Sequence, residues 1–150
     1  MAKKWLTRED SIQYLNEAFY GHLATTSNNQ PYLVPVNYVY HQNHLYIHSA
    51  LQGQKLENIR KNSRICFEVS HPIQFLPGKK PCQFGVHYWS VLVFGQANIL
   101  DDLNLKNEAL NLFIKKYSRD DYLNPMDPDD LQNVAIIDIH IETISGKANN

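Results

Sequence analysis

The stretch YIHSALQGQKLENIRKN (residues 46–62) is the segment around which the rest of the chain is organised. Apolar and polar residues alternate up to Ser49, Gly53 follows, and an amphipathic helical pattern covers about residues 52–61. The pattern predicts a strand that turns directly into a helix. The first N–H groups of a helix are unpaired and partly positive, so this turn, with Lys55 beside it, suits an anion such as a phosphate. Many turns of this composition bind nothing, so the turn alone does not decide the function.

Length and composition limit the classes of protein to which this chain can belong. A chain of 150 residues with 43% hydrophobic and 19% charged residues fits one soluble domain, residues 1–150. A net charge of −1 without a run of Lys or Arg does not support nucleic-acid binding. Neither a membrane span nor a secretory signal is recognisable. Cys66 and Cys82 form no CxxC pair, so we expect reduced thiols and a cytoplasmic protein.

Alternation and turn residues predict six strands, at residues 20–26, 31–40, 44–49, 64–70, 86–100 and 133–144. The first three are expected to form a meander. Helical spacing predicts three helices, one after a Thr7 cap with Ile12, Leu15 and Phe19 on one face, one at about 52–61 and one at about 104–117. Residues 71–84 are expected to be a loop, and 120–130 a connector.

Two residues carry specific expectations for the sheet. Pro35 cannot donate to a strand ladder, so it predicts a bulge or a sheet edge. Gly95 predicts a bend or bulge in its long strand. Six largely antiparallel strands with three helices at their ends and crossings indicate a small closed or partly open β-barrel, a mainly β fold of the α+β kind.

The sequence gives little indication of a metal-binding site or of a catalytic nucleophile. His41, His44 and His48 are close in the sequence, but His41 and His44 flank a turn and no carboxylate is expected to accompany them, so no metal site is predicted. Cys66 lies on a strand and Cys82 in a loop, neither with a defined base. Serine-nucleophile and Walker-type loops are absent from the sequence.

Several short motifs occur in a familiar order. They are G-x-L-A-T at Gly21–Thr25, P-x-x-V-P-V-N at Pro31–Asn37, Y-x-H-S-A at Tyr46–Ala50, G-x-K-L-x-N-I at Gly53–Ile59 and C-F-E-V at Cys66–Val69. With Cys82-Gln-Phe84, Tyr88–Gly95 and Ile144-Ser-Gly-Lys147, they resemble the FMN-binding split-barrel superfamily that includes the pyridoxamine 5′-phosphate oxidases. The closer resemblance is to its nitroimidazole-resistance (Nim) branch, over about residues 20–147.

This resemblance implies a six-stranded antiparallel split β-barrel with peripheral helices, acting as a homodimer with one FMN in each groove between subunits. It assigns Lys55 to the phosphate and His48 to a substrate-side polar or proton-donating role. The other cofactor-binding residues that it implies are Pro35, Val36, Asn37, Ile47, Ser49, Gln54, Trp89 and Ser90, with Tyr88 as the alternative to Trp89 because strand alternation lets only one of the two point inward. Gln54 stands where related oxidases often carry a second cation, and Gln supplies only a neutral hydrogen bond.

The resemblance favours an FMN-dependent oxidoreductase that passes electrons from reduced FMN to a small acceptor, with nitro-aromatic compounds as one class. The C-terminal ISGKANN lacks the Trp/Arg-rich segment of pyridoxamine phosphate oxidases, so that activity is disfavoured. Two alternatives stay open. The same barrel could store FMN or hold haem without being an enzyme, or it could bind no cofactor.

Overall fold

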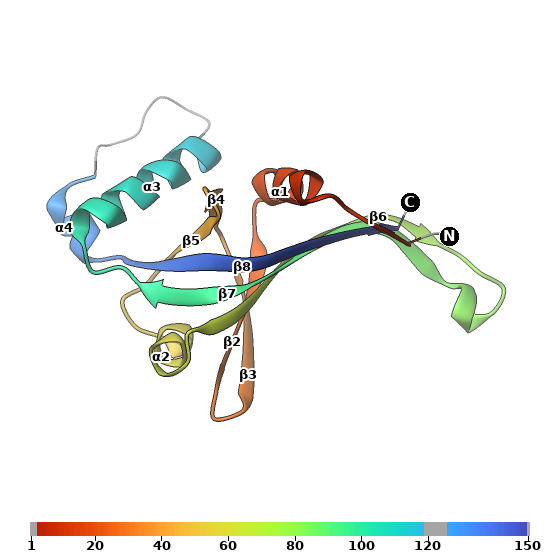
Figure 1. Ribbon diagram of the computed structural model, residues 1–150, viewed down its shortest axis with the longest axis horizontal. Coiled ribbons are helices and arrows are strands. Elements are labelled where there is room, and N and C mark those ends of the chain that lie inside the picture. Colours follow the sequence, from red (N-terminus) through yellow and green to blue (C-terminus); the bar gives the residue numbers. More distant parts are fainter. Residues whose placement is uncertain (1–2, 119–125, 150) are drawn as a thin grey trace.

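The computed structural model describes residues 3–118 and 126–149, which form a mainly β chain with helices between some of its strands (Figure 1). The described strands are β1 (Lys3–Trp5), β2 (Gly21–Ser27), β3 (Gln30–Val36), β4 (Val39–His41), β5 (His44–Ser49), β6 (Arg64–Leu76), β7 (Gly85–Ile99) and β8 (Ala135–Asn149). The helices are α1 (Arg8–Glu17), α2 (Gln54–Lys61), the short 3-10 helix η1 (Pro81–Gln83), α3 (Leu103–Tyr117) and α4 (Pro128–Gln132). The described residues thus form eight strands where six were predicted.

All eight strands belong to one antiparallel sheet with the order β3-β2-β6-β7-β8-β5-β4, and β1 pairs with β8. β3 and β4 are the two ends of this order, yet only Asn37 and Tyr38 separate them in the chain. Val36 and Val39 can therefore be at most about 11 Å apart, so the sheet must curl until its two edges approach. The expected barrel architecture follows from this constraint.

The prediction of one strand over residues 31–40 is wrong, and so is the three-strand meander. The chain leaves the sheet at Asn37, and the Tyr38 N–H bonds the Tyr117 hydroxyl (3.1 Å) instead of a neighbouring strand. Tyr38 itself is fully buried. β3 consequently pairs with β2 at one edge, and β4 pairs with β5 at the other.

Two tight turns close these edge hairpins. Asn28 and Asn29 have φ of 51° and 59°, and Gln42 and Asn43 have φ of 45° and 66°. Two consecutive left-handed residues define the type I′ turn, whose twist matches the strands it joins, and asparagine tolerates this conformation best after glycine. Pro35 pairs with His22 in regular register on β3. Its predicted position at a sheet edge is confirmed.

The core follows the alternation that the sequence shows. Phe67, Val69 and Ile139 are almost fully buried inside the barrel, together with Leu23, Leu45, Ile47, Leu56, Ile65, Val91, Val93, Ile137 and Ile141. A second cluster (Leu100, Ala109, Leu110 and Ile136) lies under α3. At Gly95 the β7–β8 register shifts, which confirms the predicted bulge.

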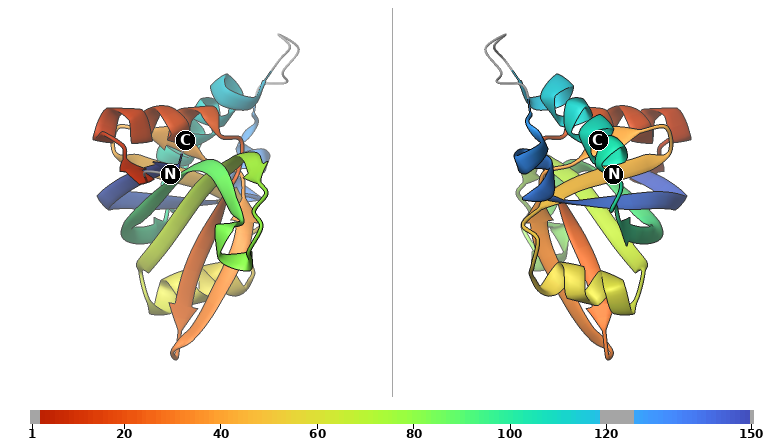
Figure 2. Two further views of the ribbon diagram at one scale, coloured as in Figure 1. Left: turned by 90° about the vertical axis from the view of Figure 1, so that its right-hand side faces the viewer. Right: turned by 90° about the vertical axis from the view of Figure 1, so that its left-hand side faces the viewer.

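Helices α1 and α3 lie on one side of the sheet and α2 lies on the opposite side (Figures 1 and 2). The Thr7 hydroxyl accepts a hydrogen bond from the Asp10 N–H (3.1 Å), as the predicted cap requires. The buried side of α1 is formed by Ser11 and Leu15, whereas Phe19 lies beyond the helix and is 56% exposed. The connector expected at residues 120–130 is partly helical, since it contains the start of α4. Residues 120–125 of this connector lie outside the described residues.

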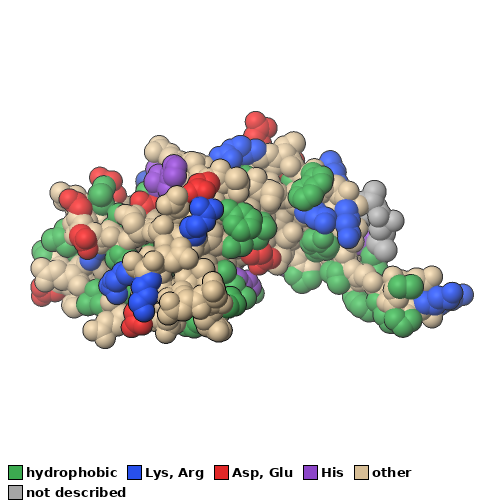
Figure 3. Space-filling view, turned by 60° about the horizontal axis from the view of Figure 1, so that its bottom comes forward, with side chains coloured by type: hydrophobic (Ala, Val, Ile, Leu, Met, Phe, Trp, Pro, Cys, Tyr) green, Lys and Arg blue, Asp and Glu red, His purple; other side chains and the backbone are tan. Residues whose placement is uncertain are grey.

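The predicted loop at residues 71–84 is only partly a loop, because residues 71–76 belong to β6 and Pro81–Gln83 form η1. β6 continues to Leu76 and β7 begins at Gly85, so the two form a long hairpin arm that projects from the barrel (Figures 1 and 3). A register shift between Pro72 and Gln74 accommodates the proline that suggested a loop. None of the helices in residues 3–118 and 126–149 is long and apolar enough to cross a membrane.

Candidate functional site

The turn between β5 and α2 presents free backbone donors. Gly53, the N-cap residue, has φ of 143° and ψ of 165°, a conformation that strongly favours glycine. Its carbonyl accepts hydrogen bonds from the N–H groups of Leu56 and Glu57, both at 3.1 Å. Within the described chain the N–H groups of Gln54 and Lys55 have no partner, and no side chain caps the helix. The turn therefore leaves two amides available for an anion.

Two side chains at this turn also lack partners. Lys55 is half-buried and makes neither an ion pair nor a hydrogen bond with any described residue. Ser49 is only 7% exposed, and its hydroxyl oxygen is buried without a hydrogen-bond partner. A buried hydroxyl without a partner costs about 1–3 kcal/mol, which a polar group of a ligand can offset. The donors of this turn thus match an oxygen-rich anion.

His48 points to the opposite face of β5 from Ile47 and Ser49. Its ring lies 4.8 Å from the Phe113 ring in an edge-to-face arrangement. Partial burial lowers the pKa of His48, and the positive charge of Lys55 lowers it further. With Asn37, Phe113, Ile114, Tyr117 and Ser118, the imidazole lines a cavity of about 450 Å³. A neutral imidazole therefore borders this cavity at pH 7.

The last turn of α3 holds the segment that links the two sheet edges. The Tyr117 hydroxyl accepts a hydrogen bond from the Tyr38 N–H (3.1 Å) and lies 2.6 Å from the Phe19 carbonyl and 2.8 Å from the Tyr38 carbonyl. The Asn37 amide also donates to the Phe19 carbonyl (3.3 Å). These contacts fix the position of Asn37 at the edge of the His48 cavity.

Lys116 strengthens the same attachment. Its Nζ donates to the Tyr38 carbonyl (3.1 Å) and lies 3.9 Å from the centre of the Tyr38 ring. Burial lowers the pKa of Lys116 to about 8. In the sequence Tyr117 is only the last residue of the helix predicted at about 104–117, because its partners lie 79 and 98 residues away. Local sequence contains no signal for such a contact.

The remaining predicted residues on β3, β5 and α2 have different surroundings. Pro35 is exposed on the edge strand, while Val36 packs partly against the core. The side chain of Ile47 is fully buried in the core, so a ligand could reach only its backbone. The Gln54 amide donates to Asn58 Oδ1 (2.8 Å) and lines a different cavity, beside the β2–β3 hairpin. None of these positions tests the predicted contacts with a cofactor.

Trp89 and Ser90 lie far from the turn within one chain. Ser90 pairs with Lys147 on β8, whereas His48 pairs with Ile136. These positions are eleven residues apart, a path of about 36 Å along the strand. Trp89 stacks on Tyr14, with ring centres 4.3 Å apart, and lines a separate cavity of about 430 Å³. A single chain does not bring Trp89 and Ser90 together with His48 and Lys55.

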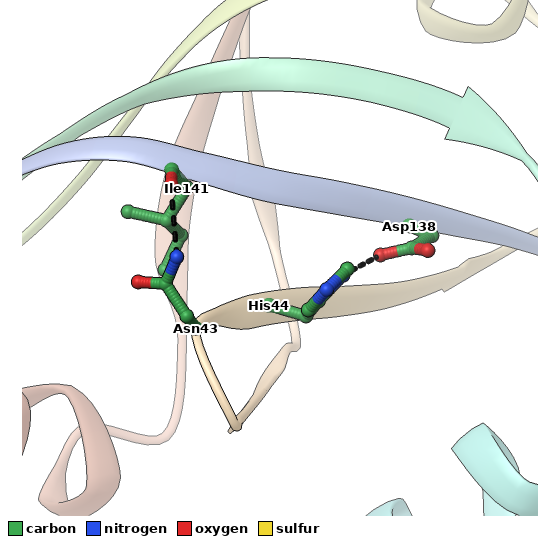
Figure 4. A network of polar contacts seen from close by, with 4 residues as sticks. All are labelled: Asn43, His44, Asp138 and Ile141. Carbon is green, nitrogen blue, oxygen red and sulfur yellow. Dashed lines mark hydrogen bonds and ion pairs between the residues drawn. The ribbon is translucent and has the colours of Figure 1, made fainter.

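The histidines near the β4–β5 turn have a carboxylate neighbour that sequence analysis missed. His44 Nδ1 lies 2.6 Å from Asp138 Oδ1 of β8, and Asn43 donates to the Ile141 carbonyl (3.0 Å), as Figure 4 shows. The expectation that no carboxylate accompanies these histidines is therefore wrong, since sheet pairing supplies one from 94 residues away. In the described part of the chain, no group of three or more His, Cys, Asp or Glu residues is arranged to hold a metal ion.

Comparison with known proteins identifies related sequences and folds. Residues 7–148 match the model of the family described as pyridoxamine 5′-phosphate oxidase. A proposed 5-nitroimidazole antibiotic resistance protein from Bacteroides thetaiotaomicron VPI-5482 has a TM-score of 0.83 at 21% identity, over 98% of this chain and 89% of that chain.

Two further similar structures are described as FAD-binding proteins. A FAD-binding protein from Mesorhizobium loti has a TM-score of 0.75 at 27% identity, over 100% of both chains. A FAD and haem binding protein from Mycobacterium smegmatis has a TM-score of 0.86 at 16% identity, over 100% of this chain and 74% of that chain. These likenesses confirm the predicted split-barrel fold class.

Removing the Tyr117 hydroxyl tests the attachment of the β3–β4 link. We expect Tyr117→Phe to lower the free energy of unfolding by about 1–3 kcal/mol, because the buried Tyr38 N–H loses its partner. Urea denaturation measures this change. Tyr40→Phe is the matched control, since the Tyr40 hydroxyl makes no hydrogen bond with any described residue. Equal stabilities of the two variants would contradict the assignment.

The lowered pKa of His48 predicts that the free energy of unfolding depends on pH. Because its pKa in the folded chain is below the usual value, the unfolded chain binds more protons once the pH falls below about 6.5. Stability from the neutral ring is present above that pH and is lost as the pH falls through the folded pKa. His48→Gln should therefore flatten the loss of unfolding free energy between pH 7.5 and pH 5, measured in urea. His87→Gln is the control, and a slope unchanged by His48→Gln would refute the assignment.

Proposed function

This chain belongs to the pyridoxamine 5′-phosphate oxidase family, and from that premise we propose that it binds FMN and passes electrons from the reduced flavin to a small acceptor. The observation that carries the proposal is the β5–α2 turn. It offers the free amides of Gln54 and Lys55, and a Lys55 ammonium without an ion-pair partner in the described residues. A phosphate monoester matches these donors in charge and in hydrogen bonding. The two similar structures described as FAD-binding proteins support a flavin as the ligand.

The flavin ring is proposed to extend from this turn toward the cavity bordered by Asn37 and His48. Ser49, with its unpartnered hydroxyl, would meet the chain between phosphate and ring. Trp89 and Ser90 line another part of the molecule, so we propose that a second subunit supplies them. This makes the functional unit a homodimer with a flavin site at each subunit interface.

The cofactor supplies the redox chemistry when it is bound, and the protein positions it and limits access of solvent. His48 is the residue proposed to act on the acceptor. Because burial and Lys55 keep its pKa low, the neutral ring can hold a proton on one nitrogen and offer it as a hydrogen-bond donor. A nitro-aromatic compound is the proposed class of acceptor, supported by the likeness to the Bacteroides protein.

A haem-binding or flavin-storing protein is the second candidate. The observation that favours haem is His44, whose Nδ1 lies 2.6 Å from Asp138, because metal-ligating histidines usually donate their second nitrogen to a carboxylate. The Mycobacterium smegmatis protein with this fold is described as binding both FAD and haem. The two candidates predict different absorption spectra.

The purified protein should be yellow, with flavin absorption bands. Heat should release a flavin that comigrates with FMN in chromatography. A Soret band would instead support haem at His44. A colourless protein that takes up neither FMN nor haem on titration would refute both candidates.

Lys55→Ala tests the phosphate site. We expect it to weaken FMN binding about tenfold or more, because a charge-assisted contact with the phosphate contributes about 1.5–3 kcal/mol. Flavin fluorescence quenching on titration measures the dissociation constant. Lys61→Ala, at the other end of α2, is the matched control and should bind FMN as the unmodified protein does. Equal affinities of the two variants would remove Lys55 from the site.

A further inference from the structure

A second cavity lies on the other side of α3 from His48. Its volume is about 370 Å³, and it separates α3 from β4, β5 and β8. Tyr46 and Asp138 are register partners on neighbouring strands, so their side chains share one face of the sheet and form one wall. The opposite wall comes from α3, where Leu105, Glu108, Leu112 and Lys115 recur at helical spacing. None of these residues takes part in the proposed flavin site.

The charges of this cavity do not cancel. Glu108 and Asp138 bring two carboxylates and Lys115 brings one ammonium group, so the formal charges sum to one negative charge when His41, which also lines the cavity, and His44, which bonds Asp138, are counted as neutral. Both carboxylates act on the Tyr46 hydroxyl, since burial raises its pKa and the charges of Asp138 and Glu108 raise it further. Asp138 Oδ1 is bonded to His44, which leaves Oδ2 available. Among the described residues neither Glu108 nor Lys115 makes an ion pair or a hydrogen bond.

The cation that matches this cavity is organic. In the described part of the chain the His, Cys, Asp and Glu residues form no group of three or more that could hold a metal ion. Leu105 is 47% exposed and lines the cavity together with Leu112, so hydrocarbon surface lies close to the carboxylates. A small ligand could bury an apolar body against these leucines while its charged end meets the acids.

We infer that this cavity binds a small organic amine, with its ammonium group toward Glu108 and Asp138 and its hydrocarbon against Leu105 and Leu112. Protonated Tyr46 adds a hydroxyl that can accept a hydrogen bond from the ammonium group. The site is independent of the flavin site, since the two cavities lie on opposite sides of α3 and share no lining residue.

Hexylamine is the probe, and hexanol is its uncharged counterpart. Titration of the ¹⁵N-labelled full chain, as purified, should shift the backbone amide resonances of Tyr46, Glu108 and Leu112 with hexylamine and leave them nearly unchanged with hexanol. Glu108→Gln should raise the dissociation constant for hexylamine about twofold to fivefold, the range for a partly exposed charge pair. Lys115→Met should lower it by a similar factor, because it removes a repelling charge. Glu9→Gln, on α1, is the control and should not change it.

Glu108 and Lys115 are both exposed, and their substitutions are expected to change the dissociation constant in opposite directions. Loss of folding would weaken binding in both variants, so the two explanations can be distinguished. Equal shifts with hexanol and hexylamine would overturn the inference, as would unchanged affinity in both Glu108→Gln and Lys115→Met. Shifts spread over the whole chain without saturation would overturn it as well. The measurement needs no flavin, so failure of the FMN proposal would leave this test intact.

Discussion

The hydrogen bond between the Tyr38 N–H and the Tyr117 hydroxyl is the contact on which the arrangement of the site depends. Tyr38 lies between β3 and β4, which are the opposite ends of the sheet, so the chain must cross the split of the barrel there. A backbone amide that leaves a strand ladder inside the core needs another partner. Tyr117 provides it, and Lys116 bonds the neighbouring carbonyl. The same contacts therefore hold the two sheet edges together and place Asn37 at the cavity that His48 lines.

Helix α3 has a role that its amphipathic pattern does not reveal. Its C-terminal turn borders the His48 cavity through Phe113 and Tyr117, and the Phe113 ring lies edge-to-face against the imidazole. Its opposite side borders the cavity that contains Glu108 and Lys115. One helix thus shapes both cavities.

The candidate phosphate site was accessible to sequence reasoning because its parts are local. Gly53 predicts a break before a helix, and Lys55 follows within one turn, so the anion-friendly junction can be read from consecutive residues. The apolar residues that alternate along residues 64–70 and 133–144 are also the ones buried on β6 and β8, since a period of two places them on one face. The hairpin arm was missed because three prolines and a glycine at residues 72–81 resemble a loop, whereas a register shift accommodates Pro72.

By itself the sequence determined the mainly β architecture, the strand-to-helix turn at residues 46–62 and the family to which the chain belongs, because these rest on local periodicity and on short motifs in order. Only the tertiary structure decided that residues 31–40 divide between the two sheet edges, that Asp138 meets His44, and that Trp89 lies away from His48. The physical reason is that these outcomes depend on strand pairing and on contacts between residues tens of positions apart. Local preference does not encode such contacts, which are set by how the whole sheet curls around its core.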